Sequence, residues 1–208
     1  MNIIITAPSL NPNENVSGIS SVAQFIISNN GGQRYLHFEL GKKDKERGGW
    51  HRVPALMRKY GEWKRMLAEH PDAIVHYNFP LSKASLLRDP WFMRYAWKQG
   101  RKMVVHVHGG LFLTAPHIPG YLLRIMRWVF GQNMPFIVLS DMEREILVER
   151  FGAREVYSLP NCVDLKDAEA YAKEKEEASL SEEGLRDSDI ASSHHQVRIQ
   201  PLRIGYLG

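Results

Sequence analysis

The sequence lacks the features that define several broad classes of protein. It has one cysteine, Cys162, in 208 residues, so no disulfide forms within the chain, and a reducing compartment is expected. No apolar run approaches the roughly 18 residues that a membrane span requires. The opening MNIIITAPSL has neither a basic n-region nor a long apolar h-region, which is typical of a strand and not of a secretory signal. We therefore expect a cytoplasmic protein.

Nucleotide-binding motifs are missing as well. The dinucleotide fingerprint G-x-G-x-x-G and the P-loop with its lysine do not occur, and no DNA- or RNA-binding module has its signature here. The closest feature is NENVSGISSVAQF (13–25), which stands between an apolar strand and an amphipathic helix. Gly18 there would let backbone N–H groups approach a phosphate, although an ordinary turn glycine has the same local signature.

Acidic residues are scarce outside one segment. The chain has 27 Lys and Arg against 23 Asp and Glu, but residues 166–189 hold nine acids and four bases. The remaining 23 bases and 14 acids leave a body of charge +9. A net charge of this sign favours binding to nucleic acid, anionic lipid or phosphorylated small molecules. The alternative is a basic surface that is simply solvated.

Apolar runs alternate with helical patterns from the first residue to about residue 160. Strands are predicted at 3–6, 34–38, 73–78, 102–107, 135–140 and 155–160. Helices are predicted from Ile19 onward and at 50–69, 82–99, 118–131 and 141–151. Strands that are apolar throughout indicate a parallel sheet covered on both faces, and right-handed crossovers favour a doubly wound, Rossmann-like α/β fold.

The composition changes after Asp164. Residues 166–196 contain few large apolar side chains, so we expect a charged helix that grades into disorder. PLRIGYLG (201–208) has the pattern of a fresh strand. The predicted organisation is a Rossmann-like domain at 1–165, a charged linker or insertion at 166–200, and the first strand of a truncated second domain at 201–208.

Two histidines interrupt the valine run VVHVHGG (104–110). His106 and His108 share one strand face, and each is a core histidine, a metal ligand or a catalytic group. No acidic or cysteine partner lies nearby in the sequence. His108 is at the carboxyl tip beside Gly109 and Gly110, where open α/β sheets bind ligands, whereas His106 is deeper and is expected to be structural.

Polar residues also follow the fifth and sixth predicted strands. Ser140 or Asp141 is a candidate N-cap in LSDMERE, and Gly152 in RFGAR has the usual place of a C-terminal helix glycine. Asn161 and Asp164 in SLPNCVDL lie at the same predicted rim, where an Asx-type turn is the alternative to a ligand contact. Cys162 between them has no basic neighbour that would activate it as a nucleophile.

Aromatic and basic residues mix in DPWFMRYAWKQGRK (89–102) and in IPGYLLRIMRWVFG (118–131). Ordinary packing helices account for both stretches. The alternative is a basic and aromatic face that contacts lipid headgroups or a lipid-linked substrate.

An ordered set of stretches resembles the N-terminal domain of GT-B glycosyltransferases, in particular retaining family 4. They are NVSGIS (15–20), VVHVHGG (104–110), IVLSDMEREILVERFG (137–152) and LPNCVDL (159–165), followed by LRIGYLG (202–208). The resemblance implies transfer of a sugar from a nucleotide-sugar donor to a glycan or lipid-linked acceptor, with retention and without a metal or other cofactor. By analogy with this family, the chain is expected to act in polysaccharide biosynthesis.

The resemblance also implies roles for single residues. Gly18, with Ser17 beside it, would approach the donor diphosphate, and His108 would lie against the donor sugar as the catalytic candidate. Ser140 and Asn161 match family positions that shape the cleft and the domain crossover, and Gly109 and Gly110 are further candidate substrate-binding residues. Ser17 stands where the family has a second glycine, and Cys162 where it has a glycine after the proline–asparagine pair.

The family's diphosphate-binding basic pair and its glutamates belong to a C-terminal domain. This chain is therefore expected to be the acceptor-side half, with that domain supplied in cis, no nucleic-acid partner, and peripheral contact with the inner face of a membrane. The alternatives are a non-catalytic Rossmann-like binding module and a GT-B-type nucleotide-sugar epimerase.

Overall fold

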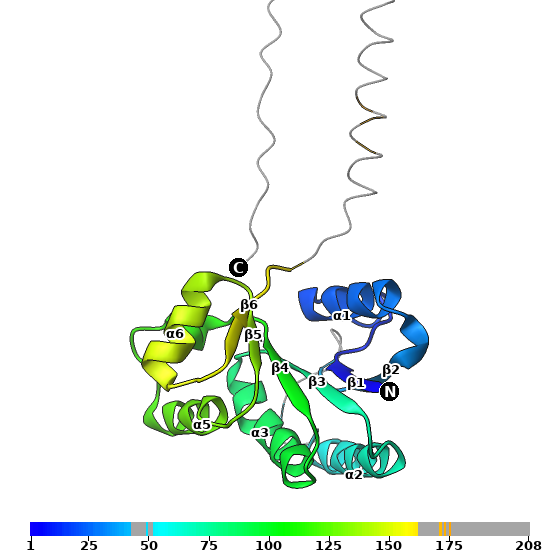
Figure 1. The fold of residues 1–208 in the computed structure, drawn as a ribbon, viewed down its shortest axis with the longest axis horizontal. Coiled ribbons are helices and arrows are strands. Elements are labelled where there is room, and N and C mark those ends of the chain that lie inside the picture. The colour runs from blue at the N-terminus through cyan, green and yellow to red at the C-terminus, as the bar shows by residue number, and fades with distance from the viewer. Residues whose placement is uncertain (43–48, 50–51, 162–170, 172, 174, 176–208) are drawn as a thin grey trace, which may run out of the picture. The chain divides into compact units, whose positions relative to one another are not determined.

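Six parallel strands form one sheet at the centre of the unit Met1–Val163 (Figure 1). The computed structural model describes residues 1–42, 49, 52–161, 171, 173 and 175. The chain divides into two units, Met1–Val163 and Asp164–Gly208, and every element named below belongs to the first. The predicted linker and second-domain strand therefore lie outside the described residues, apart from Tyr171, Lys173 and Lys175.

The strand order is β2-β1-β3-β4-β5-β6, and every neighbouring pair is parallel. The strands are β1 (Ile3–Ala7), β2 (Tyr35–Glu39), β3 (Ile74–Phe79), β4 (Met103–Val107), β5 (Phe136–Val138) and β6 (Val156–Ser158). The order reverses beside β1, so the loops after β1 and β3 leave the sheet in opposite directions and open a crevice between them. The prediction of a doubly wound, Rossmann-like α/β fold is confirmed.

Helices connect the strands as predicted. They are α1 (Gly18–Asn29), α2 (Val53–Glu69), α3 (Lys83–Lys98), α5 (Gly120–Phe130) and α6 (Asp141–Phe151). Two short elements were not predicted, a 3₁₀ turn η1 (Gly32–Arg34) and the four-residue α4 (Leu111–Thr114). A single turn is too short to produce a periodic pattern in the sequence.

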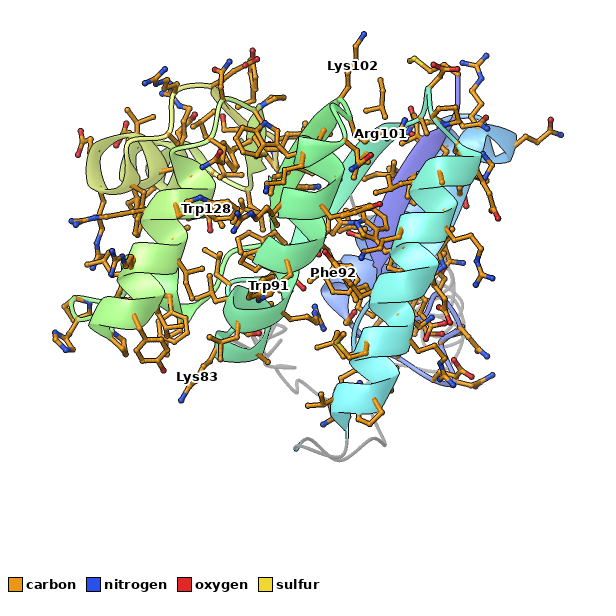
Figure 2. The ribbon with its side chains drawn as sticks, turned by 90° about the horizontal axis from the view of Figure 1, so that it is seen from below. Lys83, Trp91, Phe92, Arg101, Lys102 and Trp128 are labelled. Carbon is orange, nitrogen blue, oxygen red and sulfur yellow. The ribbon has the colours of Figure 1, made fainter. Side chains whose placement is uncertain are left out.

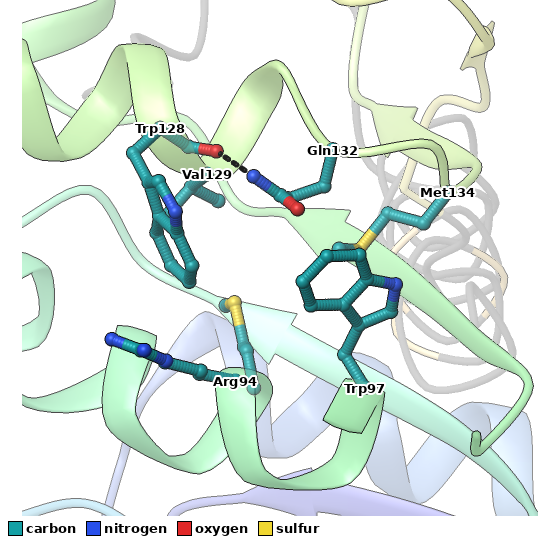
Figure 3. Close-up of a pocket in the computed structure, with 7 residues that line it drawn as sticks. Arg94, Trp97, Trp128, Val129, Gln132 and Met134 are labelled. Carbon is teal, nitrogen blue, oxygen red and sulfur yellow. Dashed lines mark hydrogen bonds between the residues drawn. The ribbon is translucent and has the colours of Figure 1, made fainter. Parts of the chain in front are cut away.

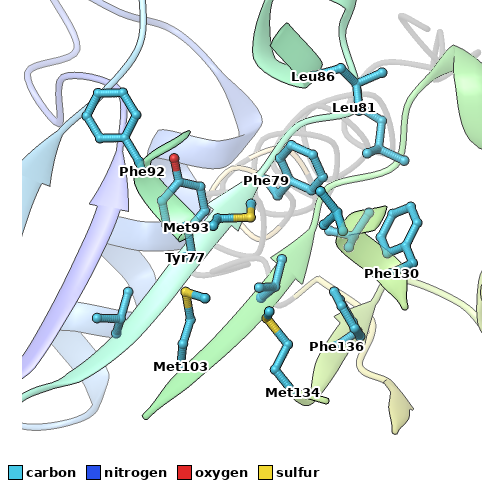
Figure 4. Packing of buried hydrophobic residues seen from close by; sticks show 14 of the residues in the cluster. Tyr77, Phe79, Leu81, Leu86, Phe92, Met93, Met103, Phe130, Met134 and Phe136 are labelled. Carbon is cyan, nitrogen blue, oxygen red and sulfur yellow. The ribbon is translucent and has the colours of Figure 1, made fainter. Parts of the chain in front are cut away.

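The main core lies between the sheet and the layer that contains α2, α3 and α5, whereas α1 lies on the opposite side of the sheet (Figure 1). Seen from below in Figure 2, α2, α3 and α5 lie side by side, and α3 packs against both neighbours. Aromatic side chains fill this layer (Figure 4). Phe130 of α5, for example, has its ring centroid 5.3 Å from that of Phe136 and 5.4 Å from that of Phe151.

The opposite face of the sheet has a small buried cluster where α1 packs on β1. Its members are Ile5, Ala7 and Ala23. Along β3 and β4 the same face carries His76, Asn78, His106 and His108, because alternate residues of a strand point to opposite faces. Met103, Val105 and Val107 take the other face and join the main core. This alternation explains why a valine run contains two histidines.

None of the described helices is both long enough and apolar enough to cross a bilayer.

Phe130→Ala is expected to lower the free energy of unfolding by about 3–5 kcal/mol, because it removes a fully buried ring and leaves a cavity. Tyr121→Ala on the same helix is the matched control, since Tyr121 is 50% exposed and its loss should cost under about 0.5 kcal/mol. Urea denaturation of both variants measures the difference. Equal losses would contradict the placement of Phe130 in the core.

Candidate active site at the carboxyl ends of the strands

His108 lies directly after β4, at the rim of the sheet, and its side chain is half-buried. Its backbone N–H donates to the Phe79 carbonyl at 3.1 Å, which extends the β3–β4 ladder by one residue. The imidazole therefore projects from a rigid strand end and not from a loose loop. This is the position at which an open parallel sheet presents groups to a ligand.

A hydrogen-bond chain across three strands orients that imidazole. The buried side chain of Asn78 on β3 donates through Nδ2 to the Thr6 carbonyl on β1 at 2.7 Å. Its Oδ1 consequently points toward His108 and accepts from Nε2 at 2.7 Å. The backbone N–H of Asn78 also donates to Thr6 Oγ1 at 3.0 Å. Because Nε2 is the donor, Nδ1 of a neutral His108 carries the lone pair.

His108 is neutral at physiological pH. Burial lowers the pKa of His108 to about 3, with further lowering from His106 and His76. A base this weak takes up few protons near neutrality, so proton abstraction is a poor task for it. No described residue is hydrogen-bonded to Nδ1, which can accept a bond from a ligand hydroxyl.

Two further histidines, His106 and His76, lie next to His108. The ring centroid of His106 is 4.1 Å from that of His108, and Nδ1 of His106 is 3.4 Å from Nε2 of His76. Burial lowers the pKa of His76 and of His106 to about 4. His106 is only 2% exposed, as expected for a structural residue, and its Nε2 has no hydrogen-bond partner.

The described residues include no group of three His, Cys, Asp or Glu placed to hold a metal ion. Metal independence of the reaction stays a prediction.

Gly109 and Gly110 connect His108 to α4, and Gly110 is the N-cap residue of that helix. Both have positive φ, +60° and +131°. A Cβ at Gly110 would lie 2.8 Å from Leu81 Cβ and 2.9 Å from the Leu81 carbonyl oxygen. The segment therefore needs glycine at 110 for its conformation and for the close approach of the loop after β3. This structural role accounts for the glycine whether or not a substrate touches it.

Ser17 and Gly18 begin α1 at the same rim. Ser17 is the N-cap and accepts from the Ser20 N–H at 3.2 Å, while the Ser20 hydroxyl donates to Asn15 Oδ1 at 3.0 Å. Gly18 is the first helical residue, exposed, and a Cβ there would meet no atom within 4 Å. The turn alternative for Gly18 is thus wrong, and the described fold does not require a glycine at this position.

Ser140 is the N-cap of α6, one of the two predicted positions, and its Oγ accepts from the Glu143 N–H at 3.3 Å. Glu143 Oε2 accepts from the Leu139 N–H at 2.8 Å, and its other oxygen lies 3.3 Å from an ideal Cβ on Gly109. The start of α6 therefore adjoins the loop after His108. Gly152 ends the helix in a left-handed conformation, as predicted.

Asn161 is exposed on the chain that leaves β6. No described contact joins Asn161, Ser17 or Gly18 to His108. Their shared place at the rim follows from strand polarity alone. Cys162 and Asp164 lie outside the described residues.

A cavity of about 830 Å³ opens at the switch point between β1 and β3. Its wall comes from the ends of β1, β2 and β3, from the loops that follow them, and from the first two turns of α2 and α3, with Ile19 of α1. Asn78 belongs to this wall, so the residue that orients His108 also faces the cavity. The sequence-based prediction missed this cavity, because its lining residues are spread from Ala7 to Arg88.

The described part of the cavity wall is basic. Its described residues include five cations and one carboxylate, namely Lys42, Arg52, Arg58, Lys59, Arg88 and Glu39. Arg58 and Lys59 share one partner, Glu62, at 3.9 and 3.1 Å. Arg88 bonds the fully buried Asp89 through Nε, and burial raises the pKa of that carboxyl group against the opposing effect of Arg88.

The strand order, the switch-point cavity and the rim define a Rossmann-like α/β domain of the kind that forms the N-terminal half of GT-B enzymes. Residues 35–167 match the model of Glycosyltransferase Family 4, which is more than half of the chain. The chain belongs to that family. None of the curated proteins or solved structures compared with it gives a significant match.

The family match includes β2 to β6 and most of the rim, with Asn78, His108 and Ser140. It starts after α1, so the roles of Ser17 and Gly18 depend on the resemblance of their loop alone. Asn78 is a candidate site residue that sequence reasoning overlooked. The available signal was a polar side chain closing the third apolar run, AIVHYN (73–78).

Asn78→Asp is expected to raise the pKa of His108 by more than one unit, because a carboxylate accepting from Nε2 stabilises the imidazolium. Histidine NMR titration of the unmodified chain should show the Nε2–H tautomer and a His108 that stays neutral well below its ordinary pKa of 6.5 for as long as the chain is folded. Asn133→Asp, on an exposed loop, is the control. An unchanged His108 titration in Asn78→Asp would disprove the assigned hydrogen bond.

Acidification is expected to destabilise the fold between about pH 6.5 and pH 4. At a pH below 6.5, their ordinary pKa, His76, His106 and His108 bind protons in the unfolded chain. In the folded chain their lowered pKa values keep them unprotonated until the pH is lower still. Each adds a slope of at most about 1.4 kcal/mol per pH unit to the free energy of unfolding. Urea denaturation at successive pH values tests this, with His76→Gln predicted to flatten the curve.

Gly110→Ala should cost at least about 1 kcal/mol of stability, because alanine is strained at this φ and collides with Leu81. Gly18→Ala should be neutral or stabilising by up to about 1 kcal/mol, since the site is open and helical. Thermal unfolding of the two variants compares them. A destabilised Gly18→Ala would mean that the fold, and not a ligand, accounts for this glycine.

Proposed function

We propose that this chain is the acceptor-side half of a retaining glycosyltransferase, which moves a sugar from a nucleotide-sugar donor to a glycan or lipid-linked acceptor. Family membership supports the transferase class. The observation that carries the proposal is the link between cavity and imidazole. Asn78 lines the 830 Å³ cavity and holds His108 at 2.7 Å, so an acceptor in the cavity would lie beside the donor sugar at His108.

The proposed reaction breaks the bond between the anomeric carbon and a diphosphate oxygen. An acceptor hydroxyl oxygen forms the new bond to that carbon and loses its proton. His108, with a pKa of about 3, is too weak a base to take this proton at neutral pH. The departing diphosphate gains negative charge and is the better proton acceptor. His108 would instead accept a hydrogen bond at Nδ1 from a sugar hydroxyl and orient the ring.

The basic wall of the cavity favours an acceptor that carries a phosphate or another anionic group. Among the described residues, five cations and one carboxylate face the cavity; Arg58 and Lys59 share Glu62, and Arg88 is paired with the buried Asp89. Partial burial strengthens such interactions relative to open solvent. The donor diphosphate would approach the start of α1, where Gly18 presents no side chain and the helix N-terminus attracts negative charge.

The product of the full reading frame, incubated with radiolabelled UDP-glucose, UDP-N-acetylglucosamine, UDP-galactose or GDP-mannose and a membrane lipid extract, is expected to label an acceptor. The 208-residue chain alone should show negligible turnover. Epimerised donor without acceptor labelling would identify an epimerase. No turnover of any donor by the full-length protein would favour the binding module.

His108→Ala in the full-length protein should lower turnover about tenfold or more, the expected effect of losing one hydrogen bond to the sugar, without unfolding the domain. Gly18→Ala should reduce turnover while its stability is kept. The control is His70→Ala, a histidine at the end of α2 and away from the rim. Unchanged turnover in His108→Ala would return His108 to a structural role.

A further inference from the structure

A second surface, on α3 and α5, has the composition of a membrane-binding face. We define the α3–α5 aromatic face by its exposed residues: Leu87, Trp91, Arg94, Trp97 and Lys98 of α3, and Tyr121, Arg124, Arg127 and Trp128 of α5. We propose that this face binds the headgroup region of an anionic membrane. The proposal does not depend on the transferase activity.

The first observation is the exposure of large apolar side chains. Trp91 is 64% exposed, Tyr121 50%, Leu87 46%, Trp97 44% and Trp128 37%. Three tryptophans on two adjacent helices are unusual for a solvated surface, where large apolar side chains are normally scattered. Tryptophan and tyrosine are the side chains that gather where apolar chains meet polar headgroups.

The second observation is that these side chains share one surface. On α3, positions 87, 91, 94 and 98 are spaced by three or four residues and form one stripe. On α5, positions 121, 124 and 128 do the same, and the two helices pack against each other. Figure 2 shows Trp91 on α3 and Trp128 on the neighbouring α5. Trp97 and Trp128 line one shallow pocket between the helices, with Arg94 at its edge (Figure 3).

The third observation is the sign of the charge. Arg94, Lys98, Arg124 and Arg127 are exposed, and the only acid of the two helices, Asp89, is fully buried. Basic residues beside exposed aromatic rings match an anionic lipid surface, which attracts each cation near it and receives the rings at headgroup depth. A protein partner of ordinary composition would not require this uniform sign.

The chain is expected to sediment with vesicles of equal phosphatidylcholine and phosphatidylglycerol, and much less with vesicles of phosphatidylcholine alone. Added salt should release it, because the Debye length shrinks. Arg94→Glu with Arg127→Glu should weaken the vesicle partition coefficient by at least about fivefold for each cation removed. The control is Arg34→Glu with Arg154→Glu. It changes the net charge by the same amount as the first pair, at exposed positions outside the face.

Trp91→Ala with Trp128→Ala should weaken binding even at low salt, and tryptophan fluorescence of the unmodified chain should shift to the blue on adding anionic vesicles. Tyr157→Ala, which removes a 56% exposed ring on β6, is the aromatic control. Circular dichroism should show every variant folded, since all changes are at exposed positions.

Three results would overturn the proposal. They are absence of binding to anionic vesicles, equal binding to neutral ones, and equal losses in the face and control variants. Self-association in sedimentation that the face variants abolish, without vesicle binding, would mark the face as a protein interface instead.

Discussion

The strict alternation of side chains along β3 and β4 separates the hydrophobic core from the polar candidate site. One set of alternate residues, among them Tyr77, Val105 and Val107, is buried beneath α3 and α5 and forms the main core. The other set places Asn78, His106 and His108 on the opposite face, where polar groups meet across the parallel register. A shift by one residue would bury the histidines in the core and expose the valines. The core that stabilises the fold therefore lies on one face of β3 and β4, and the candidate site lies on the other face.

The site follows from that arrangement and from the direction of the strands. Parallel polarity brings the loops after β1, β3 and β4 to one rim, and the reversal of strand order beside β1 opens the cavity. The hydrogen bonds from Thr6 through Asn78 to His108 join the cavity to the imidazole. Burial keeps that imidazole neutral, which suits it to accept a hydrogen bond and not to carry a proton. The membrane-binding face proposed on α3 and α5 lies on the helix layer and uses residues that neither the core nor the cavity needs.

Sequence patterns predicted the elements well and the site in part. All six strands, the five longer helices, the cap at Ser140 and the helix end at Gly152 are where periodicity and capping chemistry placed them. The rim position of His108 was also predictable, because glycines directly follow its strand. Asn78 was overlooked since nothing near it in the sequence identifies its partners, Thr6 and His108. Gly110 was a candidate substrate-binding residue, yet the approach of Leu81 already explains it.

What the sequence by itself determined is local. Apolar spacing specifies strand or helix, and an ordered set of short motifs was enough to indicate glycosyltransferase family 4, to which the chain belongs. Only the tertiary structure decided which polar residues meet. The hydrogen bond between Asn78 and His108 spans 30 positions, and the cavity wall spans Ala7 to Arg88. The physical reason is that hydrogen-bond geometry, burial and pKa depend on neighbours across strands, and those neighbours exist only once the sheet has its order and register.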